Sequence, residues 1–158
     1  MATELTLDTT DTTTTAAART TRKSITRFFP HVGRILLGLV FFVFGLAYFI
    51  DFLPPPSGPI SEGAMAVGGA FMKSGYMFPL IKGTEVLVGA LLLSNRFVAL
   101  ALALIAPVIV NIVLFHAFLA PDGIVMALIV LALEVYLAWS YRHVYRSMLV
   151  ARTTPGGQ

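Results

Sequence analysis

Four polar residues interrupt stretches of otherwise apolar sequence. Lys82 and Glu85 lie in one such stretch, Asn111 lies in the next, and Glu134 lies in the last. Ionisable and strongly polar side chains cost free energy at membrane depth, so they usually face the interior of a helix bundle and mark a functional site. Amine, carboxyl and amide groups bind polar ligand atoms or exchange protons. The four residues are therefore predicted to form one ligand or proton site.

The four residues are expected to share one depth. Counted from the outer end of each predicted helix, they lie about 9 to 16 Å deep at about 1.5 Å per residue. Lys82, Glu85 and Gly89 are three and four residues apart, which puts them on one helix face. A structural interpretation stays open, in which Lys82 and Glu85 neutralise each other. Asn111 and Glu134 would then tie helices together through hydrogen bonds.

Three residues near the outer surface are weaker candidates. His116 lies five residues from Asn111, about 140° around a helix, so we expect it to lie outside the cluster and to be solvated. Tyr48 and Asp51 lie at the outer end of the first apolar stretch. There they either cap the polar layer or lie among the lipid head groups.

The composition indicates a membrane protein. The chain has 158 residues, of which 57% are hydrophobic and 12% are charged, whereas a soluble domain has about a quarter charged residues. This composition excludes a soluble enzyme, and also a nucleic-acid-binding protein despite the net charge of +3. The chain has no cysteine, which removes disulfides, thiolate nucleophiles and iron–sulfur ligation. No metal site is predicted, because His31, His116 and His143 lie on different elements.

Four apolar stretches are long enough to cross about 30 Å of hydrocarbon as helices. They comprise residues 34–53, 76–94, 97–119 and 123–141. Residues 61–74 are expected to form a short helix at the outer surface. The connections between the last three stretches are short, so these spans must be antiparallel neighbours. We predict an all-α polytopic membrane protein, with an antiparallel four-helix bundle over residues 31–149.

The two ends of the chain are predicted to be disordered tails. Residues 1–30 are rich in threonine and end in basic side chains, and residues 150–158 contain little apolar surface to bury. Positive charge favours the cytoplasmic side of a membrane. Both termini are therefore expected in the cytoplasm, because this orientation puts most cations there: Arg19, Arg22, Lys23, Arg27, Arg34, Arg96, Arg142, Arg146 and Arg152.

Two segments resemble a known family. Residues 34–39 read Arg-Ile-Leu-Leu-Gly-Leu, with Phe-Gly-Leu at residues 44–46, and residues 80–93 read Leu-Ile-Lys-Gly-Thr-Glu-Val-Leu-Val-Gly-Ala-Leu-Leu-Leu. These segments resemble the first and second spans of DoxX-like integral membrane proteins. Many members carry a lysine shortly after the Gly-Leu of the first span, where this chain has Tyr48 and Phe49.

The resemblance implies a role in membrane redox chemistry. The family is named for a small membrane subunit of a thiosulfate:quinone oxidoreductase, and other members are linked to redox complexes and oxidative-stress responses. It implies an accessory subunit in a bacterial cytoplasmic membrane, with quinone as cofactor and a soluble redox subunit as partner. It marks Glu85 and Gly89 as a signature of the second span. The alternative is a non-enzymatic carrier of a small solute or a scaffold, because the residues contain no known catalytic constellation. They do not fix the oligomeric state either.

Overall fold

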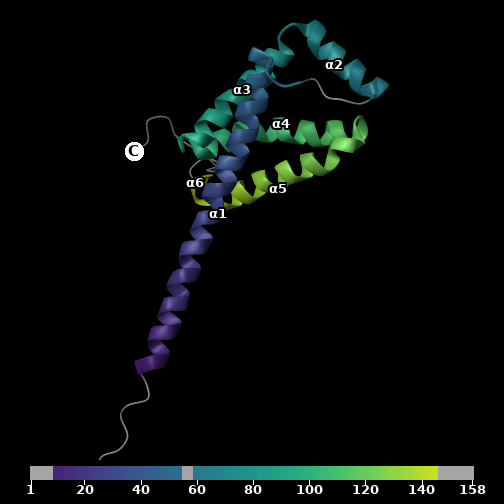
Figure 1. The fold of residues 1–158 in the computed structure, drawn as a ribbon. Helices are drawn as coiled ribbons and strands as arrows, with labels where there is room; N and C mark the ends of the chain where they lie inside the picture. Colours follow the sequence, from purple (N-terminus) through teal and green to yellow (C-terminus); the bar gives the residue numbers. More distant parts are fainter. Residues whose placement is uncertain (1–8, 55–58, 146–158) are drawn as a thin grey trace, which may run out of the picture.

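The computed structural model describes residues 9–54 and 59–145, and every regular element in these ranges is helical. This confirms the all-α prediction for the described residues. The predicted C-terminal tail and residues 1–8 lie outside them. In chain order the elements are α1 (Thr9–Ile50), α2 (Glu62–Ser74), α3 (Met77–Leu93), α4 (Val98–Phe118), the 3-10 turn η1 (Pro121–Gly123), α5 (Ile124–Ser140) and α6 (Arg142–Tyr145) (Figure 1).

Three apolar helical segments are long enough to cross a membrane. They are Phe28–Ile50, Val98–Phe118 and Pro121–Ser140, which extend over about 35, 32 and 30 Å at 1.5 Å per residue. The predicted second span differs, because α3 extends over only about 25 Å. It joins α2 through a bend of 91°. The pair reaches the length of a span only when α2 and α3 are taken together.

Residues 9–30, predicted as part of a disordered tail, are helical in the structure. The helix runs without a break from Thr9 to Ile50 and passes through Pro30. The apolar segment Phe28–Ile50 acts as the nucleus, and each added residue gains a backbone hydrogen bond at small cost, even where it is threonine. Figure 1 shows the N-terminal part of α1 projecting as a rod away from the other helices.

Glycines allow α1 and α3 to pack closely. A Cβ atom on Gly89 of α3 would lie 2.7 Å from the Cα of Phe42, and one on Gly45 of α1 would lie 2.9 Å from the Cβ of Glu85. Side chains do not tolerate such distances, so the helices meet here because these positions carry none. Gly38 makes a third close approach. The three glycines together make the α1–α3 crossing close.

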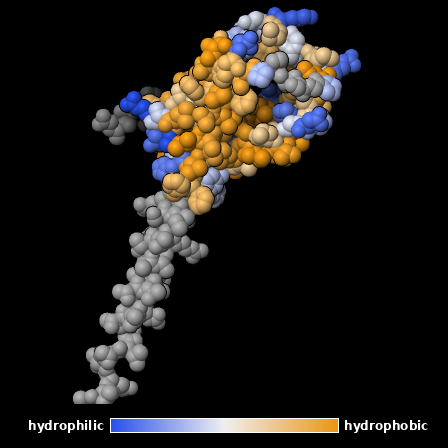
Figure 2. Space-filling model, viewed as in Figure 1, coloured by the Kyte–Doolittle hydropathy of each residue, from blue (hydrophilic) through white to orange (hydrophobic). Residues whose placement is uncertain are grey.

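The remaining helices complete the bundle around an aliphatic core. α1 packs against α3 and α5, and α4 packs between α3 and α5. Figure 2 shows a broad hydrophobic surface over these helices, with hydrophilic atoms gathered towards its ends. Large exposed apolar side chains make up this surface, as expected where lipid covers a protein. The buried core contains Leu37, Phe41, Val88, Leu92, Leu102, Ile105, Ile109 and Leu137.

Candidate functional site

Three helices enclose the candidate site: α3 and α4 form its walls, and α2 covers it as a roof. α3 and α4 meet at a tight turn in which Asn95 and Phe97 adopt left-handed backbone angles, and they diverge away from it (Figure 1). α2 lies across the open end. Gly75 ends α2 with a φ of 75°, which allows the sharp bend into α3. At the other end of α2, the Ser61 hydroxyl donates a hydrogen bond to the carbonyl of Leu119. Both ends of the roof are therefore fixed.

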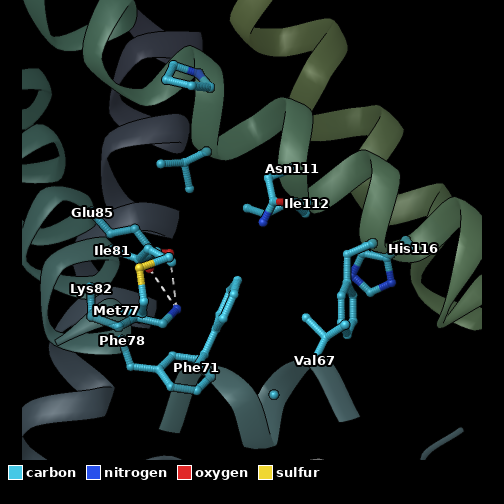
Figure 3. Close-up of a pocket in the computed structure, with 14 residues that line it drawn as sticks. Val67, Phe71, Met77, Phe78, Ile81, Lys82, Glu85, Asn111, Ile112 and His116 are labelled. Atoms are coloured by element: carbon cyan, nitrogen blue, oxygen red, sulfur yellow. Dashed lines mark hydrogen bonds and ion pairs between the residues drawn. The ribbon is translucent and has the colours of Figure 1, made fainter. Parts of the chain in front are cut away.

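A pocket of about 510 Å³ lies between these helices. This volume falls within the range of about 300–1,000 Å³ that is usual for small-molecule sites. Most of the wall is apolar, and Figure 3 shows polar groups on two opposite sides of the space. The apolar lining includes Val67, Phe71, Met77, Phe78, Ile81, Val108, Ile112 and Phe115. The polar lining consists of Lys82, Glu85, Asn111 and His116.

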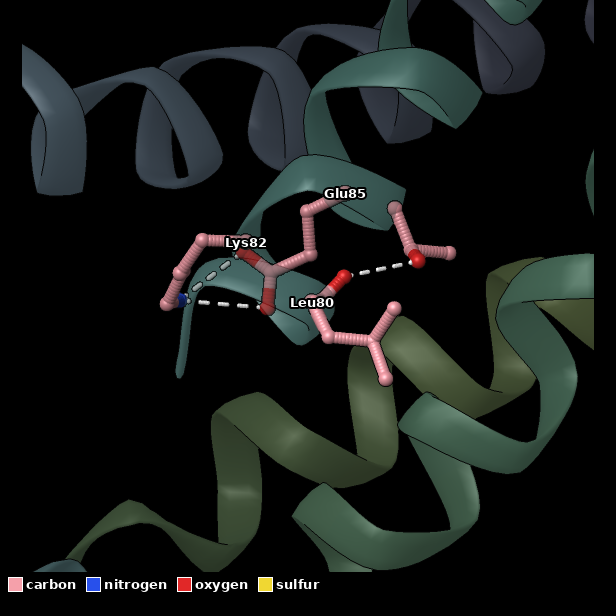
Figure 4. Close-up of polar contacts among 4 residues, drawn as sticks. Leu80, Lys82 and Glu85 are labelled. Atoms are coloured by element: carbon pink, nitrogen blue, oxygen red, sulfur yellow. Dashed lines mark hydrogen bonds and ion pairs between the residues drawn. The ribbon is translucent and has the colours of Figure 1, made fainter. Parts of the chain in front are cut away.

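Lys82 and Glu85 form an ion pair on the α3 wall. The Lys82 Nζ donates to the two Glu85 carboxylate oxygens at 2.8 and 3.1 Å (Figure 4). The Glu85 side chain is 5% exposed and that of Lys82 is 24% exposed, so the ammonium is the more accessible member of the pair. Because an ammonium has three N–H donors, at least one stays available to a ligand. The nearby Thr84 hydroxyl instead donates to the carbonyl of Leu80 at 2.8 Å.

Asn111 faces the ion pair from the α4 wall (Figure 3). Its side chain is exposed, and it has no hydrogen-bond partner within residues 9–54 and 59–145. An amide without partners is costly in an apolar medium. Asn111 therefore offers a free donor and a free acceptor to a molecule in the pocket. Pro107 lines the pocket one turn earlier and has no N–H to donate to the carbonyl of Ala103.

His116 also lines the pocket, which corrects the prediction that it lies outside the cluster. Its Nδ1 lies 2.9 Å from the carbonyl oxygen of Ala120. The ring packs over Gly123, where a Cβ atom would collide with it. The pocket extends along α4 beneath α2 and reaches both His116 and Asn111.

Glu134 does not line this pocket. It lies on α5, where its side chain is buried, and its Oε2 atom has no hydrogen-bond partner in the described part of the chain. The structure thus brings Lys82, Glu85 and Asn111 together and leaves Glu134 apart. Counting residues along a helix predicts how deep a side chain lies. It does not predict which neighbouring helices the side chain faces.

Tyr48 and Asp51 are likewise absent from the pocket lining. The Tyr48 ring stacks on Phe78, with centroids 6.0 Å apart, and Phe78 lines the pocket. Tyr48 therefore supports the wall from behind. Asp51 is exposed just beyond the end of α1, with a φ of 46°.

The contribution of α2 to the site was not predicted. Val67, Gly68 and Phe71 line the pocket from this helix. A signal was present, because Ala64, Val67 and Phe71 follow the three- and four-residue spacing of one helix face. This face points towards the other helices, and Ala64 is buried.

The role of Arg34 in joining two helices was not predicted either. Its side chain is 6% exposed, although the residue was counted among the cytoplasmic cations. The guanidinium donates hydrogen bonds to the carbonyls of Leu92 and Leu93 in the last turn of α3. A cation at a helix C-terminus satisfies free carbonyls and interacts favourably with the helix dipole. Arg34 thus holds α1 and α3 together at the end away from the pocket.

The described residues contain no group of His, Asp and Glu side chains that could hold a metal ion. The comparisons with family models, with curated proteins and with solved structures find no match. The pocket and its polar side chains therefore carry the functional argument.

Proposed function

We propose that this chain is a DoxX-like multi-pass protein of a bacterial cytoplasmic membrane and that its pocket binds the head group of a membrane quinone. In this role it is an accessory subunit of a quinone-linked oxidoreductase or oxidative-stress complex. A soluble partner subunit supplies the electrons. One observation carries the proposal: Lys82 and Asn111 present polar groups from opposite walls of an apolar pocket. Polar groups among apolar helices of this kind are typical of functional sites in membrane proteins.

The proposed topology has four crossings and cytoplasmic termini. α1, α4 and α5 each cross alone, and α3 crosses together with α2 as a bent pair. Arg34, Arg96 and Arg142 support this orientation, since they lie at one end of the bundle and Lys73 lies on α2 at the other. Arg142 also lies over the ring of Trp139, 5.1 Å from its centroid. Such aromatic and basic pairs are typical of the membrane interface.

The pocket suits a quinone because its chemistry matches both parts of that molecule. The carbonyl oxygens of a quinone accept hydrogen bonds, which the Lys82 ammonium and the Asn111 amide donate. Its flat ring packs favourably against aromatic side chains such as Phe71. Glu85 neutralises Lys82 and orients it, so the wall binds a neutral ligand without an uncompensated charge. A bound quinone supplies the capacity to take up two electrons and two protons.

Photo-crosslinking tests the proposal. The full chain is purified in lipid nanodiscs, labelled with an azido-quinone and digested, and the labelled peptides are identified by mass spectrometry. We expect labels within residues 67–85 and 107–116, and an excess of unmodified quinone should compete with them. Asn111→Leu removes a donor to the ligand, and Glu85→Gln leaves the Lys82 ammonium uncompensated and without the carboxylate that orients it. Each variant should weaken labelling by about tenfold, or about 1.4 kcal/mol.

Glu134→Gln is the matched control. It removes an equally buried carboxylate outside the pocket, so its labelling should equal that of the unmodified chain. Labelling that is insensitive to both pocket variants would contradict a quinone site and favour a carrier or scaffold. Mass spectrometry of copurifying proteins tests the accessory role separately. If the chain binds quinone but purifies from its native membrane without a redox partner, the accessory role is contradicted and the quinone site is not.

A further inference from the structure

We infer that the pocket opens sideways, between α3 and α4, into the outer leaflet of the membrane. The ligand then enters from the hydrocarbon and keeps a long apolar tail there after its head group has bound. This inference rests on the proposed quinone site and adds the class of ligand: a membrane-dissolved, long-tailed molecule rather than a water-soluble solute.

The pocket lies on the flank of the bundle rather than along its axis. Its lining residues come from α2, α3 and α4, and none comes from α1 or α5 in the described part of the chain. α1 packs against α3 and α5, and α5 packs against α4. α1 and α5 therefore cover the opposite side of the gap between α3 and α4. The pocket thus lies on the side of the gap between α3 and α4 that faces away from the hydrophobic core.

The exposure along α4 indicates where the mouth lies. Asn111 and Pro107 line the pocket and are nevertheless exposed. Their neighbours Val110 and Leu114 are each 50% exposed, as expected for side chains in contact with lipid. Asn111 lies seven residues from the outer end of α4, which is about 10 Å below that end. Asn111, at the exposed edge of the pocket, therefore lies at the depth of the acyl chains rather than at that of the head groups.

The edge of the pocket on α3 is also apolar, because Met77, Phe78 and Ile81 line it there. Figure 2 shows hydrophilic atoms in a recess below α2, beside a continuous hydrophobic surface. The Asn111 amide lines the pocket at the depth of the acyl chains, where a missing partner costs free energy. A lipid-borne head group with carbonyl oxygens supplies that partner.

α2 closes the direct route from the outer aqueous phase. Val67 and Phe71 of this helix lie over the pocket (Figure 3). The bond from Ser61 to Leu119 fixes one end of α2, and at its other end the Ser74 hydroxyl accepts a 3.1 Å hydrogen bond from the backbone N–H of Met77. Because α2 covers this end of the pocket, the open side is the flank between α3 and α4.

Site-specific fluorescence tests the route of entry. The chain has no cysteine, so a single cysteine carries a small fluorophore without background labelling. In liposomes, a probe at Asn111→Cys should be quenched by lipids brominated on their acyl chains, as strongly as a probe at the lipid-facing control Val110→Cys. Aqueous iodide should quench it far less than a probe at Asp122→Cys, which is exposed at the outer turn. Strong iodide quenching without bromolipid quenching would overturn the inference.

A second position protects the test against misfolding. Val108 lines the same pocket, and a probe at Val108→Cys should show the same preference for bromolipid over iodide. Variants are compared only when their size-exclusion profiles match that of the unmodified chain. The opposite preference at both pocket positions would place the mouth in water.

Competition in the photo-crosslinking assay separates this inference from the proposed function. A quinone with a long prenyl tail should compete about tenfold better than a tail-less quinone with the same head group, because the methylene groups of the tail concentrate it in the hydrocarbon from which the pocket is entered. Equal competition by both would overturn side entry and leave the quinone site intact. Competition by neither would contradict the quinone site itself.

Discussion

Gly89 of α3 lies directly against the backbone of Phe42 of α1, at a distance that leaves no room for a side chain. A Cβ atom at position 89 would lie 2.7 Å from the Phe42 Cα. Glu85 lies one turn away on the same face of α3, where it approaches Gly45 of α1. This helix crossing therefore buries the carboxylate of the ion pair and fixes the α3 wall of the pocket.

We expect Gly89→Ala to lower the free energy of unfolding by about 1–3 kcal/mol, because the added methyl group forces two helix backbones apart. Thermal or SDS-induced unfolding in detergent measures this change. Gly83→Ala is the matched control on the same helix, since a Cβ there meets nothing within 4 Å. It should be neutral or stabilise by up to about 1 kcal/mol through helix propensity. Equal destabilisation by both variants would disprove the close crossing.

The Lys82–Glu85 pair should show energetic coupling in a double-mutant cycle. Glu85→Gln leaves the ammonium without its carboxylate, and Lys82→Met leaves a carboxylate that is only 5% exposed without its cation. Each single variant should lose about 1.5–3 kcal/mol, and the double variant should lose less than the sum, because neither charge is then left unpaired. Unfolding in SDS measures the three values. Lys73→Met, an exposed lysine on α2, should be neutral, and additive losses would disprove the coupling.

Local sequence patterns predicted the helices well. Residues 76–94 and 97–119 were expected to form helices, and α3 and α4 occupy Met77–Leu93 and Val98–Phe118. The short turn at Ser94, which separates these two helices, depends only on nearby residues. The structure differs from the prediction at the start of α1. Residues 9–27 extend a helix that is already formed by the residues after them, so their conformation does not depend on their own composition alone.

The site was predictable only in part. Lys82 and Glu85 are one turn apart, so helix geometry alone brings them together, and their face packs on α1 at Gly45 and Gly89. The separation of Glu134 from the pocket was not predictable, because it depends on how α5 is rotated against α4. The inclusion of His116 depends on α2, whose 91° bend at Gly75 is a tertiary feature.

Arg34 should stabilise the end of the bundle away from the pocket. Arg34→Met keeps the aliphatic stem and removes the donors to the carbonyls of Leu92 and Leu93, so we expect a loss of about 1.5–3 kcal/mol. Hydrogen exchange of the last turn of α3 should become faster, which mass spectrometry resolves. Arg96→Met removes an exposed arginine from the adjacent turn and should change neither quantity. Unchanged exchange in Arg34→Met would show that the guanidinium does not hold α3.

His116 should carry its proton on Nδ1 when the ring is neutral. The Ala120 carbonyl can only accept a hydrogen bond, and the Nδ1 atom lies 2.9 Å from it, so Nδ1 must be the donor. This leaves the Nε2 atom as an acceptor for a donor group on a ligand or water. Nitrogen-15 NMR distinguishes the two ring nitrogens. His31→Gln and His143→Gln remove the other histidines and leave one signal pair to assign.

Gly123→Ala should abolish this preference for Nδ1. A methyl group at position 123 collides with the His116 ring, so the ring has to move away from the Ala120 carbonyl and the nitrogen-15 shifts should move towards those of a mixed tautomer. Gly69→Ala, where a Cβ meets nothing within 4 Å, should leave both shifts unchanged. If Gly123→Ala preserves the Nδ1–H signal, the contact between the ring and η1 does not position His116 in the pocket. The imidazole would then be held by the α4 backbone alone.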